Sequence, residues 1–172
     1  MKTKIVYGLI LASVFAVLFA SRGLTKSGNV SIDANELYKV AYTIDGDTFV
    51  VEVGSKLITA RMLGIDTPET VDPRKPPQCY GHEASEKTNS LLRGHNVKLI
   101  ANPNRERTDK YGRYLMYVYR DDGLFLNGYL LENGYAREYT YGTPYTLQGD
   151  FKDKQKKAQD AHVGLWGRCV KY

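Results

Sequence analysis

Residues 61–69 read Arg-Met-Leu-Gly-Ile-Asp-Thr-Pro-Glu, a strand-like half followed by a polar half. The first half alternates as a β-strand does, so Arg61, Leu63 and Ile65 are expected on one face of that strand. Because Leu63 and Ile65 have core character, Arg61 would face the core, where a guanidinium is costly unless it is paired or lines a cleft. Pro68 restricts the backbone before it and fixes its own φ. The stretch therefore predicts a strand that runs into a rigid loop with two carboxylates.

Short β-rich runs and three helical segments surround this stretch. An Asp-Gly pair between the first two runs predicts a hairpin turn. The predicted strands are 38–43, 48–53, 56–64, 96–100 and 115–119, and the predicted helices are 81–93, 126–132 and 147–162. A helix inserted after the third of five strands, in a chain of this size, favours an α+β, mainly β fold. We expect a five-stranded OB-fold barrel with three helices.

The N-terminal segment, residues 1–20, has the pattern of an export signal. Lys2 and Lys4 form a short positive region, and residues 5–20 are uncharged and almost wholly apolar. This run is short for a membrane-spanning helix, which needs about 20 residues. The sequence thus predicts a secreted or extracytoplasmic protein. The alternative is an uncleaved signal anchor that holds the protein to the membrane through residues 5–20.

The rest of the chain has the composition of one globular domain. Residues 21–36 are rich in Ser, Gly, Asn and Thr and predict a linker, so the folded domain is expected over residues 37–172. The chain carries 24 Lys and Arg against 19 Asp and Glu. This mild positive excess is compatible with a polyanionic partner. The 14 tyrosines against five phenylalanines suit partly exposed faces and flat ligands, because tyrosine joins an apolar ring to a polar tip.

The chain has two cysteines, Cys79 and Cys169, which predict one disulfide if the protein is exported. The bond would close a loop of about 90 residues and stabilise the fold by about 4 kcal/mol through chain entropy. Two buried free thiols are the alternative. A zinc site is not expected, because two cysteines and three scattered histidines offer too few clustered ligands.

Three separated clusters of polar residues carry the candidate chemistry. Taken singly, each has a structural interpretation as a tight turn, a surface salt bridge or a charged hairpin loop. Taken together, they supply aspartate oxygens for Ca²⁺, paired guanidiniums for a phosphate and a further carboxylate as a general base for water. This inventory fits hydrolysis of a phosphodiester. The clusters are Asp45 and Asp47; Arg61, Asp66, Thr67 and Glu69; and Lys110, Tyr111 and Arg113.

Four motifs, in the same order and at similar spacing, resemble the signatures of the staphylococcal nuclease (thermonuclease) family. They are Ile-Asp-Gly-Asp-Thr at 44–48, Arg-Met-Leu-Gly-Ile-Asp-Thr-Pro-Glu-Thr at 61–70, Tyr-Gly-His-Glu-Ala at 80–84 and Arg-Thr-Asp-Lys-Tyr-Gly-Arg at 107–113. The resemblance spans about residues 40–166 and is specific because four motifs coincide. Gly64 departs from it, since a bulkier apolar residue is common at that position.

The resemblance implies one Ca²⁺ ion, held by Asp47, Asp66 and the carbonyl of Thr67, with Asp45 close by. It also implies that Glu69 acts as a general base on the attacking water. An exported, calcium-dependent nuclease is therefore the expected function.

The resemblance further implies that Arg61 and Arg113 bind the scissile phosphate, and that Lys110 and Tyr111 contact substrate phosphate or base. Members of the family hydrolyse DNA and RNA and leave 3′-phosphate ends. The expected partner is DNA or RNA, single-stranded or flexible, bound by a monomer without a small-molecule cofactor. The alternative is a non-catalytic OB-fold module that binds nucleic acid or protein, which would need only basic and aromatic residues.

Overall fold

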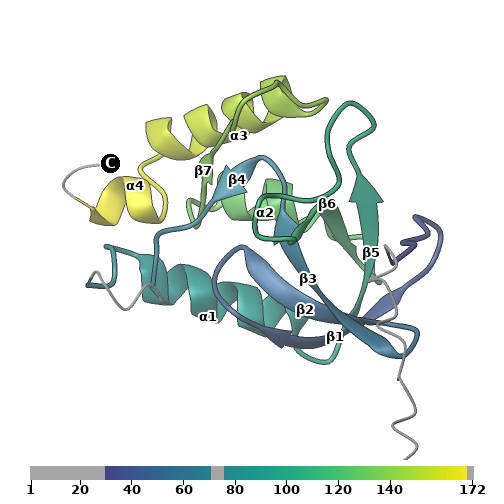
Figure 1. Ribbon diagram of the computed structural model, residues 1–172. Helices are drawn as coiled ribbons and strands as arrows, with labels where there is room; N and C mark the ends of the chain where they lie inside the picture. The colour runs from purple at the N-terminus through teal and green to yellow at the C-terminus, as the bar shows by residue number, and fades with distance from the viewer. Residues whose placement is uncertain (1–29, 71–75, 170–172) are drawn as a thin grey trace, which may run out of the picture.

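The computed structural model describes residues 30–70 and 76–169 (Figure 1). The predicted export signal or anchor at 1–20 lies outside the described residues, as does the first part of the predicted linker. Val30 and Ile32, from the last part of that linker, pack against the core of the domain. Among the described helices, none is both long and apolar enough to cross a bilayer.

Five strands form a closed barrel, which confirms the predicted OB-type architecture. They are β1 (Tyr38–Thr43), β2 (Thr48–Val53), β3 (Lys56–Met62), β5 (Asn96–Ala101) and β6 (Tyr114–Arg120). Around the barrel the order is β1-β2-β3-β6-β5, and β1 closes it by pairing Tyr38 with Val97 of β5. All neighbours are antiparallel except β3 and β6, which run parallel and pair Arg61 with Leu115. The chain between β3 and β6 is long enough for the crossover that a parallel pair needs.

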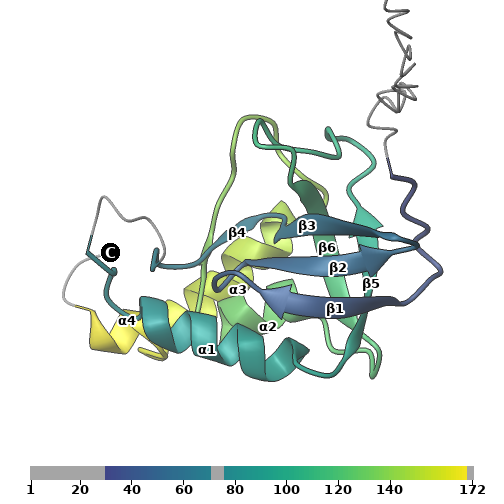
Figure 2. The ribbon, with the colours of Figure 1, turned by 60° about the horizontal axis from the view of Figure 1, so that its bottom comes forward.

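The helices cover the barrel on two sides. The three predicted helices are present as α1 (Gly81–Leu92), α2 (Leu126–Glu132) and α3 (Gln148–Asp160), followed by one short helix that was not predicted, α4 (Leu165–Arg168). α1 packs beside β1, while α2 packs against β6 and α3 against α2 (Figure 1). α4 lies next to the N-terminal end of α1 in both views of the molecule (Figure 1, Figure 2).

A second, two-stranded sheet pairs β4 (Ile65–Asp66) with β7 (Arg137–Glu138). The sequence predicted neither strand as a separate element. Each has only two residues, so no local pattern marks it. This small sheet fixes the polar loop after β3 against the segment that follows α2.

Arg61 does not share a face with Leu63 and Ile65, contrary to the sequence prediction. β3 ends at Met62, and its inward positions are Ala60 and Met62, so Arg61 faces the opposite way. Leu63 and Ile65 are buried, but they lie beyond the end of the strand. The predicted condition for Arg61 is nevertheless met, because its guanidinium is paired with carboxylates.

Gly64 is the residue that stops the strand. Its φ of 78° is left-handed, a conformation that glycine adopts without a steric penalty. A Cβ at this position would lie 2.6 Å from the ring of Tyr145. The Tyr145 hydroxyl donates to the Gly64 carbonyl at 3.1 Å. The tyrosine ring therefore occupies the space that a bulkier residue would need.

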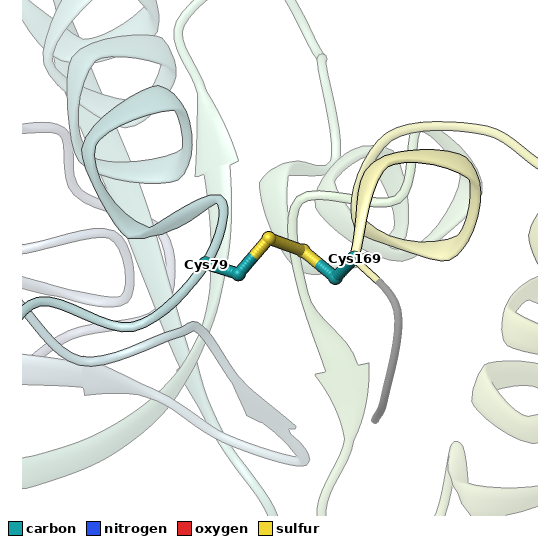
Figure 3. The surroundings of a disulfide bond; sticks show 2 residues. All are labelled: Cys79 and Cys169. Carbon is teal, nitrogen blue, oxygen red and sulfur yellow. A yellow bond between two sulfur atoms is a disulfide. The ribbon is translucent and has the colours of Figure 1, made fainter.

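Cys79, just before α1, and Cys169, just after α4, form a disulfide with a Cα–Cα distance of 5.9 Å (Figure 3). This is the pairing that the sequence predicts. The backbone N–H of Cys169 donates to the carbonyl of Leu165 at 3.0 Å, and Leu165 is buried. The bond therefore links the segment that enters α1 to a buried part of the C-terminal region.

Candidate active site

The strand register brings the predicted clusters to one end of the barrel. Asp47 directly precedes β2, whose first residue, Thr48, pairs with Arg61 of β3. Arg61 in turn pairs with Leu115 of β6, two positions after Arg113. Three segments that are far apart in the sequence therefore meet at this end.

Asp47 is the most buried carboxylate of the site, with 2% of its surface exposed. Its Oδ1 accepts hydrogen bonds from the Thr48 hydroxyl and the Arg61 guanidinium, both at 2.8 Å. Its Oδ2 accepts the backbone N–H of Thr67 at 3.2 Å. Burial raises the pKa of Asp47 to about 7, against the opposing effect of the Arg61 charge. A further positive charge nearby would therefore stabilise the ionised form of Asp47.

Arg61 bridges two carboxylates. Its Nη1 donates to Oδ1 of Asp47 at 2.8 Å, and its Nη2 donates to Oδ1 of Asp66 at 2.9 Å. Burial acts to lower the pKa of Arg61, but the charges of Asp47 and Asp66 outweigh it, so the pKa is raised. The guanidinium therefore stays charged between its two partners.

Arg137 belongs to the same arrangement, although the sequence did not predict it. β7 places Arg137 opposite Asp66 of β4. Nε and Nη2 of Arg137 donate to Oδ2 of Asp66 at 3.1 and 2.7 Å. Asp66 thus carries one guanidinium on each oxygen. The one signal in the sequence is that Arg137 directly follows residues 127–136, Asn-Gly-Tyr-Leu-Leu-Glu-Asn-Gly-Tyr-Ala, a stretch that also fits the family resemblance. Its partner, Asp66, lies 71 positions away.

The loop after β4 packs against the turn between β1 and β2. Thr67 is 8% exposed, and a Cβ at Gly46 would lie 2.7 Å from its Oγ1. From α1, the hydroxyl of Thr88 donates to the Gly46 carbonyl at 2.7 Å. These contacts hold Glu69 at the rim of the site, where its Oε1 accepts the N–H of Thr70 at 2.8 Å.

Two hollows adjoin at this end of the barrel, a small one of about 210 Å³ and a large one of about 980 Å³. We call the small one the carboxylate pocket, because it contains Asp45, Asp47 and Thr67. We call the large one the open cleft, and it contains Lys110, Tyr111 and Arg113. Four charged residues line both hollows, namely Arg61, Asp66, Glu69 and Arg137. The structure therefore brings all three predicted clusters around one continuous opening.

Arg113 is held in the open cleft by Asp109. Oδ2 of Asp109 accepts Nε of Arg113 at 2.7 Å, and Oδ1 accepts the backbone N–H groups of Arg113 and Tyr111 at 3.0 and 2.9 Å. Partial burial opposes ionisation, but these hydrogen bonds lower the pKa of Asp109 below its usual value. The Lys110 ammonium and the Arg113 guanidinium lie 5.0 and 5.3 Å from the centre of the Tyr111 ring. The exposed ring is thus flanked by two cations.

The segment after β7 also lines the open cleft. Tyr139 and Tyr141 line the cleft and are 42% and 68% exposed. The guanidinium of Arg105 donates to the backbone carbonyls of Tyr141 and Thr143. Figure 2 shows the β5–β6 loop, which carries Arg105, and the segment after β7 rising together above the barrel. The hydrogen bonds of Arg105 therefore join the β5–β6 loop to the tyrosine-rich segment.

The sequence profile of a family described as "Staphylococcal nuclease homologue" matches residues 59–168. The chain belongs to the staphylococcal nuclease family. The "Thermonuclease" of Staphylococcus hyicus is 38% identical over 168 residues, which cover 95% of this chain and 98% of that protein. The "Thermonuclease" of Staphylococcus intermedius is 34% identical over 169 residues, which cover 96% and 99%. "Endonuclease YncB" of Bacillus subtilis (strain 168) is 34% identical over 148 residues, which cover 86% and 66%.

These matches confirm the family resemblance that four sequence motifs predict. The part that matches the staphylococcal nuclease profile begins in β3 and ends in α4. It includes Glu69, Arg113 and the unpredicted Arg137. Asp45 and Asp47 precede it and fall within the longer similarity to the thermonucleases, which extends over nearly the whole chain.

The carboxylate pocket of this staphylococcal nuclease relative fits a hard cation. The residues that line it offer carboxylate and backbone carbonyl oxygens, the ligand types that Ca²⁺ prefers. Among residues 30–70 and 76–169, no three His, Cys, Asp or Glu side chains form a ready-made metal cluster. Calcium also accepts backbone carbonyl and water oxygens. Asp47, Asp66 and the Thr67 carbonyl therefore form a chemically suitable set that such ligands would complete.

Proposed function

We propose that this member of the staphylococcal nuclease family is an exported, calcium-dependent nuclease that hydrolyses phosphodiester bonds of DNA and RNA and leaves 3′-phosphate ends. One observation carries the proposal: Arg61, Asp66 and Glu69 border both the carboxylate pocket and the open cleft. Acidic groups suited to a cation thus meet cationic groups suited to a phosphate. The relatives named thermonuclease and endonuclease support this class of activity.

Asp47, Asp66 and the carbonyl of Thr67 would hold one Ca²⁺ ion, with Asp45 beside them. When bound, the ion would supply positive charge next to the reacting phosphate. The burial that raises the pKa of Asp47 supports this assignment, because a nearby cation would stabilise the ionised carboxylate.

Glu69 is the proposed general base, and it takes a proton from the attacking water. Its position at the rim shared by the two hollows supports this role, because the base must reach a water next to the phosphate. The packing of Thr67 against Gly46 keeps the backbone before Glu69 in place.

Arg61 and Arg113 bind the scissile phosphate through forked hydrogen bonds and stabilise the charge that develops on it. Each is paired with carboxylates in the structure, Arg61 with Asp47 and Asp66, and Arg113 with Asp109. These carboxylates already orient each guanidinium. A bound phosphate therefore either replaces a carboxylate partner or binds the same guanidinium beside it.

Lys110 and Tyr111 contact the substrate strand beside the reacting phosphate. The exposed rings of Tyr111, Tyr139 and Tyr141 offer stacking surfaces for unpaired bases. Such contacts suit a single-stranded or flexible substrate, because every base presents a flat face. The proposed enzyme is a monomer that needs no small-molecule cofactor.

Export is supported by the pattern of residues 1–20 and by the disulfide between Cys79 and Cys169. Disulfides persist in oxidising compartments and are rare in the cytosol. If the signal is retained, residues 5–20 would anchor the enzyme to the membrane.

The decisive experiment is to incubate the purified protein with single-stranded DNA in Ca²⁺ or in EGTA and to identify the ends formed. We expect cleavage in Ca²⁺ to 3′-phosphate ends, no cleavage in EGTA, and poor activity in Mg²⁺, which demands a tighter octahedral geometry. Full activity in EGTA would refute the metal assignment. Tight binding without cleavage under every condition would instead support the non-catalytic binding module.

A further inference from the structure

Gln78 holds the backbone of Glu69 from both sides. The side-chain Oε1 of Gln78 accepts the N–H of Glu69 at 3.0 Å, and the backbone N–H of Gln78 donates to the Glu69 carbonyl at 2.8 Å. Gln78 also lines the carboxylate pocket together with Glu69. The two backbone groups that set the direction of the Glu69 side chain are thus tied to one residue.

The turn after Gln78 connects this clamp to α1. The N–H of Gly81 donates to the Gln78 carbonyl at 3.0 Å, and between them Tyr80 adopts a φ of 68°. The Tyr80 ring lies 5.6 Å from the ring of Tyr135, which supports this left-handed conformation. A Cβ at Gly81 would lie 3.2 Å from the carbonyl oxygen of Glu69. The turn and the start of the helix therefore pack directly against the Glu69 backbone.

Cys79 lies inside this turn, next to Gln78, and its disulfide crosses to Cys169 beyond α4 (Figure 3). The far side of the bond is well anchored. Leu165 of α4 is 1% exposed, and its N–H donates to the carbonyl of Gly134 at 2.9 Å. The covalent bond therefore joins an exposed turn to a buried region.

We propose that Gln78 is a positioning residue for Glu69, and that the Cys79–Cys169 disulfide keeps Gln78 in place. The inference rests on the proposed role of Glu69 as general base. Gln78 is exposed, so water competes for its hydrogen bonds and they are weak on their own. A covalent restraint one residue away reduces the freedom of the turn and favours the bonded state. Since a misplacement of about 1 Å can slow a reaction about 100-fold, such a restraint matters for a catalytic base.

Substitution by methionine, whose side chain is about as long as that of glutamine, isolates the hydrogen bond that the Gln78 side chain accepts. Gln78→Met has no carbonyl oxygen and should lower kcat about 10-fold, while the KM for single-stranded DNA is unchanged. Gln159→Met on α3 is the matched control, because it makes the same exchange at a residue that lines neither hollow, and it should retain kcat within about threefold of the wild type. Removing the disulfide with Cys79→Ser and Cys169→Ser together should lower kcat in the same way, at a temperature where circular dichroism shows the protein folded. A loss of thermal stability with unchanged kcat in the methionine and serine variants would overturn the proposal.

A double-mutant cycle separates positioning from a general loss of structure. If Gln78 acts through Glu69, Gln78→Met should have no further effect on the residual rate of Glu69→Gln. A further 10-fold loss in that background would overturn the inference. The same series tests the proposed function separately. If the wild type cleaves DNA no faster than Glu69→Gln, the proposed function fails. If Glu69→Gln is slow and Gln78→Met cleaves like the wild type, the positioning role alone fails.

Discussion

Two walls border the open cleft and the carboxylate pocket beside it, one from the barrel and one from the loops, and they are built in different ways. On the barrel side, Asp47, Arg61 and Asp66 lie at strand ends and hold one another through hydrogen bonds of 2.8 and 2.9 Å. On the loop side, Tyr111 and Tyr141 are 72% and 68% exposed and belong to segments joined mainly by side-chain bonds. Arg61 and Asp66, for which we propose roles that need fixed geometry, therefore lie on strands, and the tyrosines proposed to contact a variable substrate strand lie on loops. We expect changes on the barrel side to lower kcat and changes on the loop side to raise KM.

The largest effect is expected on the barrel side, for Glu69→Gln. The amide keeps the shape of the side chain but cannot take a proton, so kcat should fall about 10²–10⁴-fold. Binding of an uncleavable oligonucleotide should change little, because the phosphate contacts are intact. Single-turnover cleavage and fluorescence anisotropy measure the two quantities. Near-normal turnover in a folded Glu69→Gln variant would show that Glu69 is not the general base.

Arg113 tests the boundary between the two walls, because it lies on the loop side but next to the first residue of β6. Arg113→Ala removes the group that we propose binds the charge developing on the phosphate, so kcat should fall about 10²–10³-fold. Arg113→Lys should recover little, since an ammonium cannot reproduce the forked contact. If the steady-state kinetics show a raised KM with unchanged kcat, Arg113 belongs with the substrate-contacting loops.

Arg137 should have an intermediate effect. Arg137→Gln removes the guanidinium that orients Oδ2 of Asp66, and the loss of such a supporting contact lowers metal affinity or activity about 10-fold. A Ca²⁺ titration of the cleavage rate measures both. Lys156→Gln is the matched control, because it removes a positive charge from an exposed pair with Asp160 on α3. Equal cleavage rates and equal Ca²⁺ affinities in the two variants would mean that Arg137 contributes only through net charge.

The smallest effect is expected for Arg105→Ala on the loop side. It removes the hydrogen bonds that hold the tyrosine-rich segment, so KM for single-stranded DNA should rise about fivefold while kcat stays constant. Initial rates over a range of substrate concentrations separate the two constants. A fall in kcat would show that the loop wall also positions the reacting groups, which contradicts the division between the walls.

Features that depend on local pattern could be predicted from the sequence. Short β-rich runs marked all five barrel strands, and the Asp-Gly pair marked the turn beside Asp47. The pairing of Cys79 with Cys169 followed from there being two cysteines in the chain. The motifs placed the predicted site residues in segments that the barrel register then joined.

Features that depend on distant contacts could not be predicted. Arg137 meets Asp66 only because β7 pairs with β4, and neither strand is long enough to leave a pattern. The face of Arg61 was predicted wrongly because Gly64 ends the alternation, and its conformation depends on the ring of Tyr145 far along the chain. In each case the deciding neighbour is remote in sequence.

The parallel pairing of β3 with β6 also bears on how the protein folds. The amide of Met62 donates to the Asp47 carbonyl at 2.8 Å, and that of Leu63 donates to the Met116 carbonyl at 2.9 Å. Both amides directly follow Arg61. The Met62 amide is bonded to the turn before β2, whereas the Leu63 amide is bonded to β6, which joins β3 only when the barrel closes. Non-local pairing of this kind forms slowly, since the intervening loop must be ordered first. Slow hydrogen exchange at Leu63 would therefore report the assembled candidate site, which a chain that has not yet joined β6 to β3 lacks.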